Sequence, residues 1–212
     1  KITGTFPRIY FDGTVYEANK ILSVDQWGAN QWTSKAGAFA RAENLMITAG
    51  DQPDLSNVTD MSRMFFAAAS MNNNINSWDV SNVTNMNQMF MLAEAFDKPL
   101  NNWNVSGVTT MYSLFAGSFG ETVFNQDISS WDVSSVVDMH SMFEFNKAFN
   151  QPIGVWNTAS AQFMNNMFRS ASSFDQSLGS WDMSDVTDTY NMLRDTALST
   201  PNYDATLIGW AG

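Results

Sequence analysis

The stretch WDVSNVTNMNQMF, residues 78–90, decides the fold, because variants of it recur along the chain. Successive tryptophans that open the copies lie 25, 28, 25 and 25 residues apart. An earlier copy, DLSNVTDMSRMF, starts at Asp54 without the tryptophan. Self-similarity with a period of this length is typical of repeat proteins that stack one unit on the next. The later copies begin at Trp103 (WNVSGVTTMYSLF), Trp131 (WDVSSVVDMHSMF), Trp156 (WNTASAQFMNNMF) and Trp181 (WDMSDVTDTYNML).

Each copy is predicted to hold two short elements. Apolar and polar residues alternate over residues 75–81, which is the pattern of a brief strand with one buried face. Apolar residues then recur at helical spacing over residues 83–93, which predicts about two turns of amphipathic helix. They are Val83, Met86, Met89, Phe90 and Ala93. Thr84 is placed to cap the start of that helix.

One such unit has too little core to fold alone, so the units are expected to stack and to bury their Trp, Met and Phe columns together. The predicted class is α/β: a right-handed, leucine-rich-repeat-like solenoid with short parallel strands on one face and short helices on the other. Residues 1–50 are predicted to form an N-terminal cap with one degenerate repeat, 51–198 the repeat solenoid, and 199–212 a C-terminal cap segment of the same continuous domain.

The composition disfavours several classes of binding partner and of binding site. The 212 residues carry a net charge of −11, which disfavours nucleic acids and anionic membrane surfaces. The chain has no cysteine, which excludes disulfides and thiolate metal sites. No apolar run reaches the ~18 residues of a membrane span, so no membrane insertion by this domain is expected.

The repeated phrase, followed by F-N-Q-x-I, resembles the repeat of about 25 to 26 residues in BspA-like bacterial surface proteins, which are distant relatives of leucine-rich repeats. The resemblance covers about residues 24–210. It implies a secreted or cell-surface protein with a role in adhesion or protein–protein contact. It brings no shared set of binding residues with it.

One column of the predicted helix carries large polar rings. His140, the only histidine, shares this column with Tyr112 and Tyr190. A general base needs an orienting partner and a nucleophile, and the neighbouring units offer no recognisable pair for that chemistry. The three rings are therefore predicted to be interface anchors rather than catalytic residues.

A second candidate surface is the column that directly follows the Trp position. Calcium prefers several oxygen ligands, but the chain has no D-x-D-x-D-G loop, so an exposed polar edge that contacts a partner is the preferred interpretation. Its members are Asp79, Asn104, Asp132, Asn157 and Asp182. A further column, Gln126, Gln151 and Gln176, is predicted to form hydrogen bonds from one amide to the next.

The sequence thus predicts a secreted or cell-surface, non-catalytic binding module for adhesion or protein–protein interaction, without cofactor or metal. Its expected partner is a protein or glycan on another cell or host surface, and the chain is expected to be a monomeric module of a longer protein. The alternatives are a carbohydrate-binding module and a structural spacer within a longer surface protein.

Overall fold

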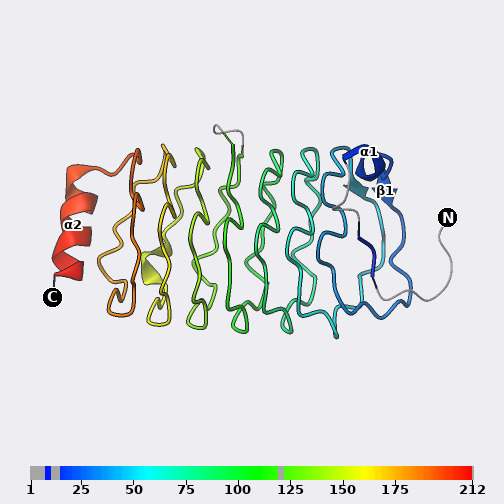
Figure 1. Ribbon diagram of the computed structural model, residues 1–212, viewed down its shortest axis with the longest axis horizontal. Helices are drawn as coiled ribbons and strands as arrows, with labels where there is room; N and C mark the ends of the chain where they lie inside the picture. The colour runs from blue at the N-terminus through cyan, green and yellow to red at the C-terminus, as the bar shows by residue number, and fades with distance from the viewer. Residues whose placement is uncertain (1–7, 11–14, 119–121, 212) are drawn as a thin grey trace.

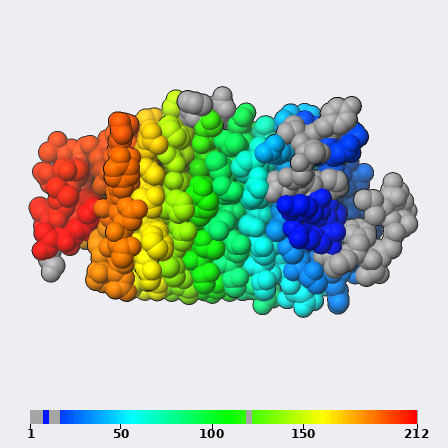
Figure 2. All heavy atoms as spheres, viewed as in Figure 1, coloured from blue at the N-terminus to red at the C-terminus, as the bar shows by residue number. Residues whose placement is uncertain are grey.

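The computed structural model describes residues 8–10, 15–118 and 122–211, and its chain runs in successive coils that stack along one axis (Figure 1). The space-filling view shows the coils as parallel bands across the molecule (Figure 2). Regular secondary structure is sparse within the described ranges. It consists of α1 (Val15–Ala18), β1 (Ser23–Val24), β2 (Met46–Ile47), the 3-10 helix η1 (Ile153–Val155) and α2 (Thr200–Trp210).

Parallel pairing connects each coil to the next. β1 pairs with β2 in the register Ser23↔Met46 and Val24↔Ile47. Beyond β2 the pairing continues as single parallel bridges between equivalent residues of consecutive units, so that segments 25 or 28 residues apart lie side by side. The continuous series is Asp60↔Asn85, Asn85↔Thr110, Thr110↔Asp138, Asp138↔Phe163 and Phe163↔Asp188.

The predicted strand over residues 75–81 is wrong, because no strand or bridge lies there. The Trp78 amide donates to the Ile75 carbonyl and the Val83 amide to the Val80 carbonyl, so this part of the backbone turns on itself. The inter-unit pairing begins later in the unit, around Asn85, in the segment that was predicted to be helical.

The predicted helix over residues 83–93 is also wrong. Alternate amides of this segment donate to the next unit instead of to the carbonyl four residues earlier. The amides between them close turns of the i→i+3 kind, and Gln88 (φ 56°) and Leu92 (φ 61°) take the positive φ that a type II turn needs at its third residue. The inter-unit bonds run from Met86 to Thr110, Gln88 to Tyr112, Phe90 to Leu114 and Leu92 to Ala116, over 2.7–3.1 Å.

Local side-chain chemistry explains why the helix does not form. The Asn85 Oδ1 accepts the amide of Asn87, which is an Asx turn that diverts the backbone from a helix. Thr84 caps no helix; its hydroxyl donates to the Thr59 carbonyl of the preceding unit, and Thr109 repeats the contact on Thr84. These side chains therefore tie neighbouring units together.

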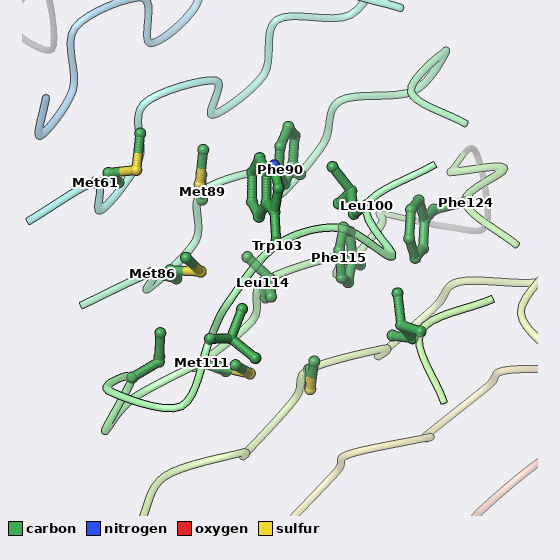
Figure 3. Close-up of a cluster of buried hydrophobic side chains, with 14 of the residues drawn as sticks. Met61, Met86, Met89, Phe90, Leu100, Trp103, Met111, Leu114, Phe115 and Phe124 are labelled. Atoms are coloured by element: carbon green, nitrogen blue, oxygen red, sulfur yellow. The ribbon is translucent and has the colours of Figure 1, made fainter. Parts of the chain in front are cut away.

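The core consists of columns that run through the stack, and part of it is shown in Figure 3. Burial of the Met and Phe columns, predicted from their period, is confirmed. Aromatic rings stack along the axis in two rows, and rings of the two rows also stack on each other at 3.8–4.2 Å. One row is Phe65, Phe90, Phe115, Phe143 and Phe168, at 5.5–5.8 Å; the other is Phe96, Phe124, Phe149 and Phe174, at 6.0–6.4 Å.

The tryptophans of the repeat are buried, as predicted, with at most 5% of their surface exposed. From Trp103 on, each indole N–H of these tryptophans also donates to a main-chain carbonyl of the preceding unit, over 2.9–3.1 Å. A buried carbonyl that lost this donor would carry an uncompensated desolvation cost. The pairs are Trp103 with Ile75, Trp131 with Leu100, Trp156 with Ile128, and Trp181 with Ile153.

Helix α2 covers the last unit and repeats the contacts of a further unit (Figure 1). The Trp210 indole donates to the Leu178 carbonyl at 2.9 Å, as the tryptophans of the repeat do. The Thr206 hydroxyl accepts the Leu178 amide at 2.9 Å. Among the described residues, no helix has both the length and the apolar character to cross a membrane.

The α2 contact depends on two glycines, and Gly209→Ala tests it. A Cβ at Gly209 would lie 2.0 Å from the Gly179 carbonyl oxygen, so the helix must shift. We expect the free energy of unfolding to fall by about 1–3 kcal/mol in urea titrations. Gly50→Ala, whose Cβ would meet nothing within 4 Å, is the control. Without the close contact, alanine would stabilise helix α2 by about 1 kcal/mol relative to glycine. A Gly209→Ala variant as stable as the Gly50→Ala control, or more stable, would therefore contradict the contact.

Candidate binding surface

The column after the Trp position forms turns. All five predicted residues are exposed, and the Oδ1 of each accepts the amide two residues later. The Ser81 hydroxyl and, second, the Ser81 amide hold the pKa of Asp79 below its ordinary value; Ser134 and Ser184 do the same for Asp132 and Asp182. These side chains therefore stabilise a turn at the edge of each unit.

A second, inner column of Asn and Asp side chains was missed by the sequence analysis. The Oδ1 of each accepts a backbone amide of the following unit. The sequence signal is an Asn or Asp directly after a buried residue, which is Met71 in the first of these units and a Phe in the later ones, as in Phe149-Asn150. The bonds run from Asp97 to Asn72, Asn125 to Asp97, Asn150 to Asn125, Asp175 to Asn150 and Ser199 to Asp175, over 2.8–3.1 Å.

The glutamine prediction is corrected by this inner column. The Gln151 amide donates to Asn125 and the Gln176 amide to Asn150, in each case over 2.8 Å between side chains. Gln126 donates to Asp97 in the same way. The glutamines thus brace the Asn/Asp column and do not bond to one another.

The structure brings together two of the three predicted ring residues. The Tyr112 and His140 rings stack with centroids 3.9 Å apart and an interplanar angle of 22°. The His140 Nδ1 lies 2.8 Å from the Asp138 Oδ1, which also accepts the His140 amide. Tyr190 stands apart, 69% exposed, because Asn165 occupies the intervening unit.

Phe163 completes this surface and was missed by the sequence analysis. Its side chain is 42% exposed, and its backbone bridges Asp138 on one side and Asp188 on the other. Other units have Asp, Asn or Thr at this position. The signal was the departure of this copy, NTASAQF, from the repeat.

Tyr112, Asp138, His140 and Phe163 lie on one face because the chain alternates about buried Met111, Met139 and Met164. Asp188 and Tyr190 hold the equivalent places in the last unit, where exposed Thr189 replaces the methionine. Met139 is fully buried between Asp138 and His140, so its two neighbours point outward. We call the resulting patch the aromatic–acidic face, which consists of Tyr112, Asp138, His140, Phe163, Asp188 and Tyr190. In the described part of the chain no cluster of three or more His, Asp or Glu side chains could hold a metal ion.

A buried amine is a further feature that the sequence did not reveal. Lys35 has no exposed surface, and its Nζ lies 3.1 Å from the centroid of the Trp32 ring and 4.6 Å from that of Trp27. The Nζ has no hydrogen-bond partner among the described residues. Burial lowers the pKa of Lys35 from 10.5 to about 6.

The stacked units and the outward aromatic–acidic face define a repeat protein with an extended surface. A family described as "Mycoplasma protein of unknown function, DUF285" matches residues 33–121 and, a second time, residues 118–205. The chain belongs to this family. Searches of curated proteins and of solved structures find no match.

Lys35→Met tests the neutral state of the buried amine. The folded-state pKa lies below the unfolded-state pKa, so the unfolded state binds more protons between these two values and wild-type stability rises with pH. We expect the variant's gain in free energy of unfolding to be largest near pH 6. The gain should shrink by up to about 1.4 kcal/mol per pH unit toward pH 9. Urea unfolding over this range measures it; a gain that does not vary with pH would contradict the assignment.

Proposed function

We propose that this chain is a non-catalytic binding module that acts outside the cell, in adhesion or protein–protein interaction. We further propose the right-handed, leucine-rich-repeat-like solenoid as its fold class. The observation that carries the proposal is the aromatic–acidic face. Phe163 exposes 42% of its surface at a position where other units have Asp, Asn or Thr, and Tyr190 exposes 69% where the neighbouring unit has Asn165.

The interior of the stack has no need of these rings. The repeat buries its own Trp, Met and Phe side chains in the core, and units such as the one with Asn85 and Asn87 stack with amides at these two positions. Exposed aromatic side chains that the fold does not require are good interface anchors. The resemblance of the repeat to BspA-like surface proteins supports a place on or outside the cell.

A carbohydrate-binding module is the second candidate, and the open ring of Tyr190 favours it. The tryptophan column cannot serve as a sugar platform because it is buried. Tyr112 and His140 stack on each other, which leaves less ring face for a sugar than two separate rings would offer. A protein ligand therefore fits this surface better than an extended glycan.

The proposal is tested with the chain immobilised against arrays of extracellular-matrix proteins, cell-surface proteins and glycans. We expect a protein hit, and we expect Tyr112→Ala, His140→Ala, Phe163→Thr or Tyr190→Ala to weaken it by about tenfold at the most sensitive position. Tyr203→Ala removes an exposed ring on α2 and is the matched control. Hits on glycans alone would favour the second candidate, and equal effects of all five variants would place the binding surface elsewhere.

A further inference from the structure

We infer that the aromatic–acidic face binds an extended, arginine-rich segment of a partner protein, with arginines three residues apart in a polyproline II conformation. This inference rests on the proposed function and specifies the partner. The argument combines the charge of this part of the chain, the fixed carboxylates of the face, the exposed rings and the spacing of the units.

The charge is concentrated where the face lies. Residues 71–212 contain 14 Asp and Glu but only 4 Lys and Arg, whereas residues 1–70 are nearly balanced with 7 and 6. Two of these four cations already pair with carboxylates outside the face, since Arg169 lies 2.9 Å from Glu144 and Arg194 lies 3.4 Å from Asp195. A cationic segment is therefore attracted to this part of the molecule.

The two carboxylates of the face are held in place. The Asp138 Oδ1 accepts the His140 amide at 3.0 Å, and the Asp188 Oδ1 accepts the Tyr190 amide at 2.9 Å. A carboxylate has about four acceptor positions. The Asp138 Oδ1 also lies 2.8 Å from the His140 Nδ1, so Asp138 retains its Oδ2 for a donor from outside, whereas Asp188 retains positions on both oxygens. A guanidinium suits both carboxylates, because its planar fork can bond both oxygens of Asp188 at once and can donate a single hydrogen bond to Asp138.

The rings favour arginine over lysine. Phe163 lies between Asp138 and Asp188 in the bridge series, so a guanidinium that reaches either carboxylate passes near its exposed ring. Tyr190 follows Asp188 by two residues and exposes its ring on the same side. Guanidinium groups stack on aromatic faces, which a lysine ammonium does less well.

The spacing selects the conformation of the segment. Asp138 and Asp188 are two units apart, and paired backbones lie about 4.8 Å apart, so the carboxylates are separated by about 9.6 Å along the stack. A polyproline II helix advances about 9.3 Å over three residues and returns to the same side. Arginines at every third position therefore meet both carboxylates.

The test uses the whole chain and a labelled dodecapeptide of four Pro-Pro-Arg triplets, followed by fluorescence anisotropy at low salt. We expect Asp138→Asn with Asp188→Asn to weaken binding by about fivefold, and Phe163→Thr by about threefold. Each substitution copies a residue that another unit carries at the same position, Asn85 or Thr110, so the turns are retained. Asp79→Asn with Asp182→Asn removes the same charge from the other column and is the matched control.

The wild-type chain gives a second, independent measurement. It should bind the arginine triplets more tightly than peptides with lysine in the same positions or with arginine at every fourth position. Equal binding of these peptides, or an equal loss in the control pair, would overturn the inference. A partner found on the arrays that needs Phe163 but is insensitive to the Asp138 and Asp188 changes would also overturn it, while leaving the proposed function intact. If neither the arrays nor the triplet peptide yields binding, both proposals fail.

Discussion

The hydrogen bonds between neighbouring units are the interaction on which the rest of the structure depends. In the described residues of the repeat units no α-helix satisfies the backbone polar groups, so alternate amides such as those of Met86 and Gln88 donate to the next unit. The indole of Trp103 and the side chain of Asn72 add bonds of the same kind. A single unit would leave these groups unpaired, which explains why the array forms as a whole and why α2 reproduces such bonds at the end of the chain.

This constraint also explains the conformation within the units. Gln88 and Leu92 adopt a positive φ, which residues with a Cβ rarely do, and the same two positions recur in other units, for example at Arg63 and Ala67. The bonds to the neighbouring unit and the burial of the Met and Phe columns offset that strain. Since the interior and the turns are fixed in this way, the outward positions are free to vary. The aromatic–acidic face arises where that variation brings large rings to the surface.

The buried residues of the core could be predicted from the sequence, because Trp, Met and Phe recur with a regular period. Residues one period apart occupy the same column of the stack. The local conformation could not. Apolar residues at Val83, Met86 and Phe90 have helical spacing, yet a series of turns buries the same residues. Positive φ at non-glycine residues has no reliable sequence signal. On the candidate surface, the shared column predicted the contact of Tyr112 with His140. Phe163 could not be predicted from the repeat, because its unit departs from the repeated phrase at this position.

The central claim is that units bond to one another in register through backbone amides. Scalar couplings across hydrogen bonds, measured by NMR on the deuterated chain, test it most directly because they identify each donor and acceptor. Couplings should connect the Gln88 amide nitrogen with the Tyr112 carbonyl carbon, and that of Phe90 with Leu114. Couplings to Thr84 and Met86 instead, four residues earlier in the same unit, would show an α-helix and contradict the account.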